Sequence, residues 1–199
     1  DLPDALTMMG NLHIERHELH AAQLKFTRVL EKVDRDDAYS LLSLGNIYYM
    51  ARAEKKERKE RNIKHAAESY WKVLHADPAN LYAANGLGVV MAAEGRLGAA
   101  AEFFTRVREG TGAMGDVVVN LAHIHMAKGD FHKAVTLYES ALRKHFKNSH
   151  PKILLYLSRA YFEAKDFVKS EEYLKRCLDV AEAKNDQALR FNLGLILET

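Results

Sequence analysis

The sequence predicts an all-α superhelical solenoid, in which helical hairpins stack on one another along the chain. Short motifs of small and large apolar residues recur at a fixed interval of 34 residues. Ala, Leu, Glu and Lys, which favour helices, are abundant, whereas the 199 residues include only 3 Pro and 11 Gly. Apolar residues recur at three- and four-residue spacing, and no stretch alternates as a half-buried strand does.

The repeat is clearest between residues 81 and 150. Each landmark returns 34 residues later: Gly88 as Ala122, Ala100 as Ala134, and Phe104 as Tyr138. Small residues at repeat positions 8 and 20 let two paired helices approach closely, and a large residue at position 24 fills the space beside them. This period and this pattern are typical of the tetratricopeptide repeat (TPR).

The same frame, extended outwards, divides the chain into five helix pairs and one half repeat. The expected repeats cover residues 3–37, 38–80, 81–114, 115–150 and 151–186, and the half repeat covers 187–199. Gly95 and Gly129 fall at turns between paired helices, where a residue free to adopt positive φ is needed. Pro3, Pro78 and Pro151 fall at junctions. Residues 1–199 are therefore expected to form a single TPR solenoid.

The second repeat is nine residues longer than the others, and the additional residues fall within 52–62. Seven basic and three acidic residues lie between Arg52 and Lys64. Glutamates precede basic residues by four positions, as in solvated helices, so we expect a charged extension that lengthens both helices of this hairpin. The basic excess leaves two functional alternatives: a contact for nucleic acid or an acidic protein face through Arg58, Lys59 and Arg61, or part of a nuclear import signal.

Composition and motifs argue against several classes of function. The formal net charge of +2 is too small to make nucleic acid the main partner. No apolar run approaches the ~20 residues that span a bilayer, so no membrane association is expected. No phosphate-binding loop, catalytic triad or carboxylate pair is apparent, so we expect neither an enzyme nor a bound cofactor. The chain begins Asp1-Leu2-Pro3 without an initiator Met, which predicts a piece of a longer protein.

Histidine and cysteine are expected to be structural. In the repeat frame His13 takes a packing position, His17 a turn and His20 the start of a helix, so no metal site is expected. His125 also takes a packing position. Cys177 is the only cysteine, and we expect it in the core rather than at a reactive site.

The first helices of stacked repeats line a concave face, where positions 2, 5, 9, 12 and 13 should form a groove for a partner. The expected lining residues are mainly apolar or aromatic: Tyr39, Leu42, Asn46, Tyr49, Tyr82, Asn85, Val89, Val119, His123, Met126, Leu155, Arg159 and Phe162, with Phe191 and Leu195 in the half repeat. Such a face is costly unless a partner covers it. Chaperone-binding TPR proteins hold a terminal carboxylate with Lys and Asn, but position 5 never holds Lys here, so a generic co-chaperone is a less favoured alternative.

Several phrases are more specific than the TPR pattern. They include Tyr-Ser-Leu-Leu-Ser-Leu-Gly-Asn-Ile-Tyr at 39–48, Asn-Leu-Tyr-Ala-Ala-Asn-Gly-Leu-Gly at 80–88, Val-Val-Val-Asn-Leu-Ala-His-Ile at 117–124, Tyr-Glu-Ser-Ala-Leu-Arg-Lys at 138–144 and Ile-Leu-Leu-Tyr-Leu-Ser-Arg-Ala at 153–160. Together they resemble the large TPR scaffold subunit of the RNA polymerase II-associated factor (Paf) transcription elongation complex. The resemblance covers most of the chain from about Tyr39 onward and extends to the charged insertion.

That resemblance implies a nuclear scaffold without enzymatic activity. Its expected partners are the Paf subunit and the parafibromin-like subunit of the same complex, with RNA polymerase II and chromatin reached indirectly. Its expected role is to support elongation and histone modification.

Overall fold

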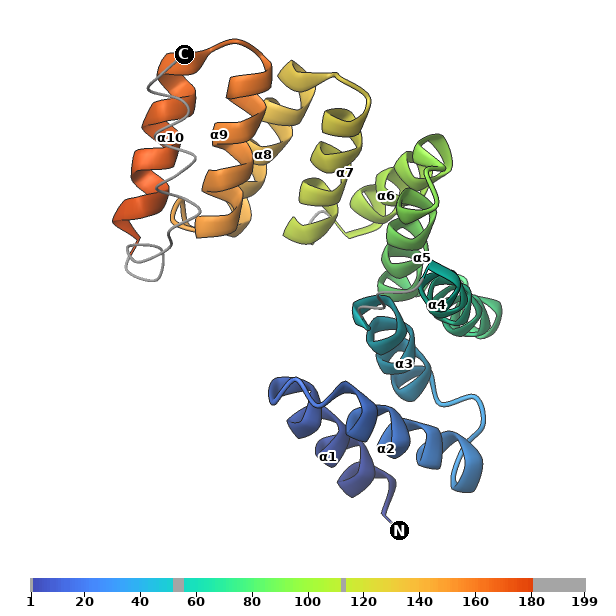
Figure 1. Ribbon diagram of the computed structural model, residues 1–199. Helices are drawn as coiled ribbons and strands as arrows, with labels where there is room; N and C mark the ends of the chain where they lie inside the picture. Colours follow the sequence, from blue (N-terminus) through green and yellow to red (C-terminus); the bar gives the residue numbers. More distant parts are fainter. Residues whose placement is uncertain (1, 52–55, 112–113, 181–199) are drawn as a thin grey trace. The chain divides into compact units, whose positions relative to one another are not determined.

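The computed structural model describes residues 2–51, 56–111 and 114–180, which contain ten α-helices and no strand. The helices follow one another in pairs (Figure 1): α1 (Pro3–Glu15) and α2 (Leu19–Lys32), α3 (Ala38–Met50) and α4 (Lys56–Ala76), α5 (Leu81–Ala93) and α6 (Leu97–Thr111), α7 (Gly115–Ala127) and α8 (Phe131–His145), α9 (Pro151–Glu163) and α10 (Phe167–Asp179). The expected all-α TPR fold is confirmed. The half repeat at 187–199, with Phe191 and Leu195, lies outside the described residues.

The chain divides into two compact units, Asp1–Phe103 and Phe104–Thr199, and the division falls within α6. Each unit is built by the same packing rule. In unit 1, α2 contacts α3 and α4 contacts α5; in unit 2, α8 contacts α9. The second helix of one repeat therefore packs against the first helix of the next. A single continuous solenoid over 1–199 stays a prediction.

Local sequence explains where the helices begin and turn. Asp37, Asn80 and Asp166 cap α3, α5 and α10, because each side chain accepts a hydrogen bond from a backbone N–H three residues later. Each hairpin turn that the structure describes needs one residue with positive φ. Gly95 and Gly129 supply it at +78°, whereas the first and fifth repeats use His17 (+60°) and Lys165 (+65°) at the same repeat position.

Small residues allow the close helix contacts that the sequence predicts. Ala22, Ala66, Ala100 and Ala134 at position 20 are fully buried. The fifth repeat has serine at both small positions, and the Ser170 hydroxyl donates a 2.8 Å hydrogen bond to the Ser158 carbonyl. The buried hydroxyl is thereby satisfied, so serine replaces alanine there without leaving an unpaired polar group. Cys177 is fully buried, as expected.

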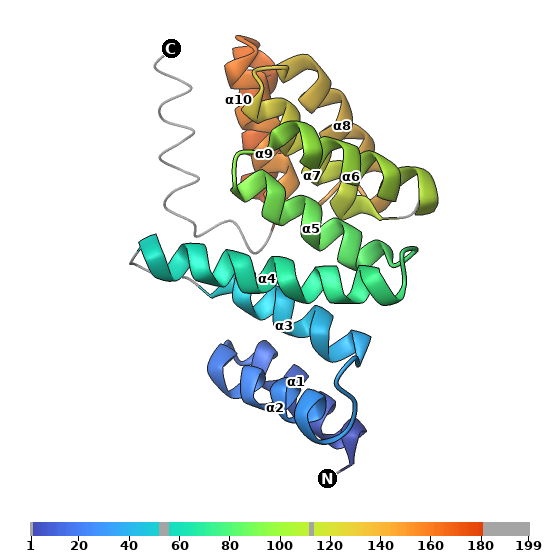
Figure 2. The same ribbon diagram turned by 90° about the vertical axis from the view of Figure 1, so that its right-hand side faces the viewer.

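The charged insertion lengthens one helix rather than two. The second helix α4 has 21 residues and includes 56–62 of the insertion, whereas α3 ends at Met50 after 13 residues, like the other first helices. Figure 2 shows α4 continuing past the end of α3. The expectation that both helices grow was wrong: α3 ends at Met50, before the first charged residue of the insertion, and the described charged residues of the insertion lie on α4.

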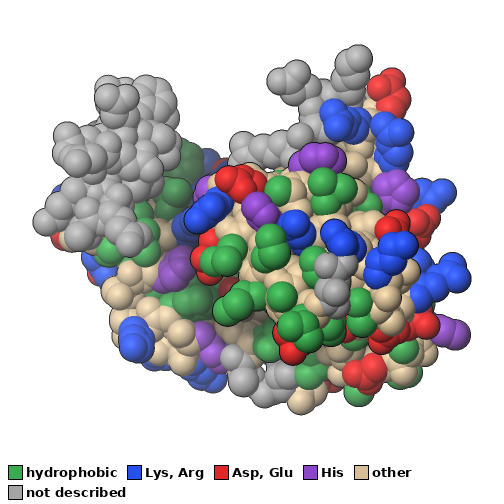
Figure 3. Space-filling model, turned by 90° about the horizontal axis from the view of Figure 1, so that it is seen from below, with side chains coloured by type: hydrophobic (Ala, Val, Ile, Leu, Met, Phe, Trp, Pro, Cys, Tyr) green, Lys and Arg blue, Asp and Glu red, His purple; other side chains and the backbone are tan. Residues whose placement is uncertain are grey.

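The first helix of the chain exposes a face that every later first helix buries. Met9 and Leu12 on α1 are 43% and 49% exposed, whereas Leu44 and Ile47, at the same repeat positions on α3, are 5% and 2% exposed. The difference arises because α2 covers α3. Hydrophobic side chains gather at this end of unit 1 (Figure 3).

Candidate binding grooves

Unit 2 contains two adjoining hollows between the first helices α7 and α9. The larger has a volume of about 500 Å³ and is lined by His123, Met126, Ala127, Phe131, Tyr138, Tyr156, Arg159 and Glu163. The smaller, of about 260 Å³, is lined by Asp116, Val119, Asn120, His123, Phe146, His150, Lys152, Ile153 and Tyr156. His123 and Tyr156 border both hollows, and we call the two together the α7–α9 groove.

An aromatic cluster forms the middle of this groove. The Tyr138 hydroxyl lies 2.6 Å from Nδ1 of His123, and the His123 ring meets the Tyr156 ring edge-on with a centroid distance of 4.6 Å. Burial lowers the pKa of His123 below its ordinary value. Burial, and then the neighbouring Tyr156, raise the pKa of Tyr138. Both groups are therefore neutral near pH 7, and the floor of the groove is an uncharged polar pair among aromatic rings.

The same hydroxyl link occurs in unit 1. The Tyr70 hydroxyl on α4 donates a 2.7 Å hydrogen bond to Oδ1 of Asn46 on α3. Asn46 and His123 share repeat position 9, and Tyr70 and Tyr138 share position 24. A core tyrosine thus fixes the polar residue at position 9 of each of these two repeats. Burial raises the pKa of Tyr70, which keeps this donor protonated.

The charges of the α7–α9 groove follow one stripe of α9. Lys152, Tyr156, Arg159 and Glu163 recur at three- and four-residue spacing, so they share one face of that helix. Neither Arg159 nor Glu163 takes part in an ion pair among the described residues, although the two are four positions apart. The groove therefore presents charges of both signs that remain available to a ligand.

Six predicted groove residues lie in the described part of unit 2, and four of them line these hollows: Val119, His123, Met126 and Arg159. Leu155 instead packs against the hydrophobic core of the unit. Phe162 meets Phe167 edge-on at 5.4 Å, next to the hairpin turn. The role of every one of these residues in binding stays a prediction.

Unit 1 contains a separate hollow of about 950 Å³. It lies where the hairpin turns gather, since its lining comes from the ends of α3 and α5 and the turn after α1: His17, Leu19, Tyr48, Tyr49, Met50, Ala51, Lys59, Asn62, Ile63 and Ala93. Of the predicted groove residues only Tyr49 lines it. The extension of α4 contributes Lys59, Asn62 and Ile63, so the insertion supplies one wall of this hollow.

The remaining predicted residues of unit 1 lie on first helices with different degrees of exposure. Tyr82 is 68% exposed and Tyr39 is 49% exposed. The Tyr39 hydroxyl donates a hydrogen bond of 2.9 Å to Oδ1 of Asn11. Leu42, Asn85 and Val89 are partly buried, and Asn46 is exposed.

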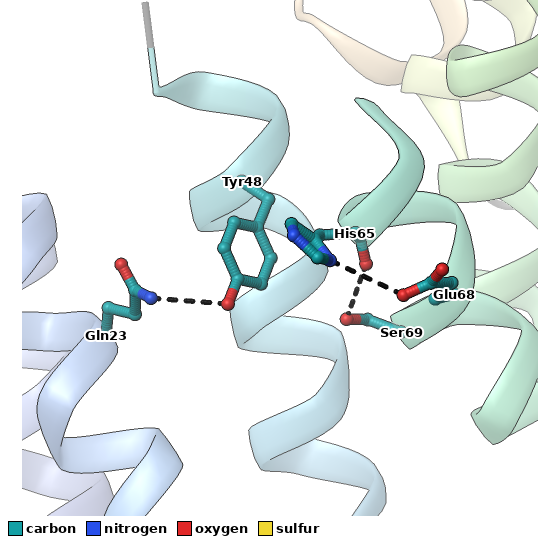
Figure 4. Close-up of polar contacts among 5 residues, drawn as sticks. All are labelled: Gln23, Tyr48, His65, Glu68 and Ser69. Carbon is teal, nitrogen blue, oxygen red and sulfur yellow. Dashed lines mark hydrogen bonds and ion pairs between the residues drawn. The ribbon is translucent and has the colours of Figure 1, made fainter. Parts of the chain in front are cut away.

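Tyr48 connects the first two repeats beside the unit 1 hollow. The amide of Gln23 on α2 donates a 3.2 Å hydrogen bond to the Tyr48 hydroxyl on α3, and the His65 ring on α4 lies 5.2 Å away (Figure 4). His65 Nδ1 lies 3.4 Å from a carboxylate oxygen of Glu68, and the Ser69 hydroxyl donates to the His65 carbonyl (Figure 4). One wall of the hollow is therefore held in place from both sides.

The three basic candidates on the α4 extension are exposed and lie on two faces. Lys59 shares a stripe with Asn62 and Ile63 and borders the unit 1 hollow, whereas Arg58 and Arg61 are one turn apart on a neighbouring stripe. None of the three is in an ion pair within the residues that the structure describes. Their positive charge is thus available to an anionic partner.

Other sites were sought across the described ranges. No group of three or more His, Cys, Asp or Glu side chains there could hold a metal ion. No described helix is both long enough and apolar enough to cross a membrane. His13 and His125 each lie next to an acidic residue five positions later, at 2.6 Å from Glu18 and 3.2 Å from Asp130, and each pair brackets a hairpin turn.

Tyr156, Lys152 and Glu163 line the α7–α9 groove but were not predicted. Tyr156 occupies position 6, where Ser43 and Gly86 are buried in the second and third repeats. The signal in the sequence is an aromatic residue at a position that holds Met8, Ser43, Gly86 and Asn120 in the other repeats. Tyr156 is partly buried and borders both hollows.

Tetratricopeptide repeat families match most of the chain. One such family model matches residues 56–113 and another matches residues 114–183. Among solved structures, a thermophilic TPR protein from Thermus thermophilus has a TM-score of 0.78 at 16% identity, covering 99% of this chain and 100% of that one. A tetratricopeptide repeat protein from Parabacteroides merdae has a TM-score of 0.75 at 13% identity, covering 96% and 70%. These structures support the fold alone.

Curated relatives are more specific. The chain is 35% identical to the protein CTR9 homolog of Arabidopsis thaliana over 98% of its length, and equally identical to the RNA polymerase-associated protein CTR9 of Caenorhabditis elegans over 98%. The Saccharomyces cerevisiae protein of that name is 35% identical over 84% of the chain. The chain spans about a fifth of the length of these relatives, 19%, 17% and 17% respectively. They confirm the resemblance to the polymerase-associated scaffold family.

Proposed function

Because the chain belongs to the tetratricopeptide repeat family and has CTR9 proteins as relatives, we propose that it is a protein-interaction scaffold of the Paf transcription elongation complex. It acts in the nucleus and binds the Paf subunit and the parafibromin-like subunit. RNA polymerase II and chromatin are reached through these partners, and histone modification depends on the assembled complex. The repeat fold and the relatives favour a binding role over an enzymatic one.

The observation that carries this proposal is the α7–α9 groove. It combines aromatic walls, Tyr138 and Tyr156, with charges that have no ion pair among the described residues, such as Arg159. Apolar surface of this kind is costly in water, whereas a groove with a few polar groups suits a helix or an extended segment of another protein. A segment that becomes ordered on binding would bury ~800 Å² or more on each side.

The test is capture of the two subunits by the immobilised chain. Met126→Glu should reduce capture at least tenfold, because it places a charge among the aromatic walls of the groove. Thr136→Glu is the matched control, since Thr136 is exposed on α8 and lines neither of the two hollows. Equal capture by wild type and by Met126→Glu would reject the groove as the binding site. Failure of the wild-type chain to capture either subunit would reject the scaffold assignment for this region.

A second candidate function is nucleic-acid binding by the α4 extension. It is motivated by Arg58, Lys59 and Arg61, which are exposed and have no ion pair among the described residues. Each cation that meets a phosphate releases counterions, so binding should weaken as salt rises. Reversal of these three charges should flatten the salt dependence of DNA and RNA affinity. Glu57 and Glu60 on the same extension oppose phosphate binding. If the charge reversal leaves the dependence of affinity on salt concentration unchanged, this candidate is rejected.

A further inference from the structure

We propose that the α7–α9 groove selects a partner segment in which one acidic side chain stands among apolar ones, and that Arg159 binds its carboxylate. This inference rests on the proposed function and adds the chemistry of the segment. It concerns one unit of the chain and the residues that line its two hollows.

Arg159 differs from the residues at the same repeat position in the second and fourth repeats, because among the described residues no core tyrosine hydroxyl is hydrogen-bonded to it. Position 9 holds Asn46 and His123 in the second and fourth repeats, and a core tyrosine hydroxyl contacts each of them, at 2.7 and 2.6 Å. In the fifth repeat position 24 holds Leu174, which has no hydroxyl to offer. Arg159 is exposed and has neither a hydrogen bond nor an ion pair among the described residues. Its guanidinium is therefore free to bind a partner.

The surroundings of Arg159 strengthen such a contact. The hollow that it lines is walled by Met126, Tyr138 and Tyr156, which bring few competing polar groups. Its positive charge also reaches Tyr138, where it partly opposes the rise in pKa that burial and Tyr156 cause. A guanidinium binds a carboxylate through two parallel hydrogen bonds, and the pair gains strength where water is partly displaced.

Glu163 restricts which acidic segments fit. It lines the same hollow one turn beyond Arg159, so a second carboxylate placed there would be repelled. At the other hollow Lys152 and Asp116 oppose one another in sign, and His123 between them is neutral. A tract of acidic residues would thus meet repulsion from Glu163 at one end, and it would find no net positive charge at the other, where Lys152 and Asp116 offset one another. A single carboxylate beside Arg159, flanked by apolar residues against Tyr156 and Met126, would not meet that repulsion.

The test uses short overlapping peptides that tile the Paf and parafibromin-like subunits, with a polyglutamate peptide for comparison. Binding to the whole 199-residue chain is measured by fluorescence anisotropy. Peptides with one acidic residue among apolar ones should bind, and polyglutamate should not. Arg159→Gln should weaken binding about 10- to 100-fold, as expected for a charge-assisted pair. Lys165→Gln, an exposed change that lines neither of these hollows, is the control.

A charge swap makes the test specific. Arg159→Glu should abolish binding, and replacing the acidic residue of the peptide by Lys should restore it. This inference would be overturned by peptides whose binding is abolished by Met126→Glu but unchanged by the substitutions of Arg159. That result would leave the scaffold proposal standing. Binding of polyglutamate as tightly as the apolar peptides would also overturn it. If the intact subunits are not captured either, the proposed function itself fails.

Discussion

The Tyr70 ring is confined between two glycines, and this confinement makes Gly86→Ala an informative change. A Cβ atom at Gly86 on α5 would lie 2.5 Å from Cζ of Tyr70, and one at Gly45 on α3 would lie 2.6 Å from its Cε1. Carbon atoms in ordinary contact are about 3.5–4.0 Å apart. The ring cannot retreat from one glycine without approaching the other, and its hydroxyl is held by Asn46.

The expected loss of stability follows from two opposing effects. Alanine is favoured over glycine in a helix by up to about 1 kcal/mol. Overpacking of a filled core costs about 1–3 kcal/mol, and the shift of about 1 Å required here has no free direction, which favours the upper part of that range. Gly86→Ala should therefore lower the free energy of unfolding by about 1–2 kcal/mol. Gly98→Ala on α6 is the control, since a Cβ there meets nothing within 4 Å, and it should be neutral or stabilising.

Urea unfolding followed by the fluorescence of Trp71 measures both variants. Trp71 is the only tryptophan of the chain and follows Tyr70 on α4, so it reports on the affected unit. Tyr70→Leu removes the ring, so Gly86→Ala should hardly change the free energy of unfolding when it is made in that variant. The double-mutant cycle should therefore give a coupling energy of about 1 kcal/mol or more. If Gly86→Ala raises stability as Gly98→Ala does, the ring is not confined and the reasoning is refuted.

Three other predictions test separate features. Leu12→Ala should lower the free energy of unfolding by less than about 0.5 kcal/mol, whereas Ile47→Ala at the same repeat position should lower it by about 2–4 kcal/mol. The reason is that only Ile47 is covered by a preceding helix. Similar losses for the two variants in urea titrations would contradict this. Lys165→Gly should stabilise by about 0.5–1 kcal/mol through relief of a positive φ, and an unchanged melting temperature would argue against strain there. Burial, followed by the hydrogen bond to Glu139 and its charge, raises the pKa of Tyr173 to about 12. Since the unfolded tyrosine ionises near 10, stability should be full below pH 10 and fall between pH 10 and 12, and Tyr173→Phe should flatten that fall relative to wild type.

The hairpin fold was predictable because small and large residues alternate at fixed positions of each repeat. Ala22 and Phe26, separated by one helical turn, are enough to place a close contact and the bulk beside it. The same logic predicted the burial of Cys177. It failed for the insertion, because counting residues shows that nine are added but not which helix receives them. The charged helix formers from Lys56 onward lie on α4, so α4 has 21 residues whereas α3 keeps 13.

The groove was only partly predictable, because a repeat position fixes the direction of a side chain but not its partners. His123 and Met126 line the hollow as their positions indicate. Leu155 lines neither hollow and packs against the core of unit 2. Tyr156 lines both hollows from position 6, which holds the buried Ser43 and Gly86 in the second and third repeats. Such differences depend on the volume of adjacent side chains, which no single position reveals.

The hydroxyl links from Tyr70 to Asn46 and from Tyr138 to His123 tie recognition to the fold. In each link, a residue that a ligand could contact is hydrogen-bonded to a tyrosine of the hydrophobic core. The third repeat has Val89 and Phe104 at these two positions and so has neither half of the link. A substitution of Asn46 or His123 that alters binding specificity would leave a buried tyrosine hydroxyl without its hydrogen-bond partner, unless the tyrosine changed as well. We therefore expect strong epistasis between these pairs, with viable evolutionary paths requiring both members to mutate together.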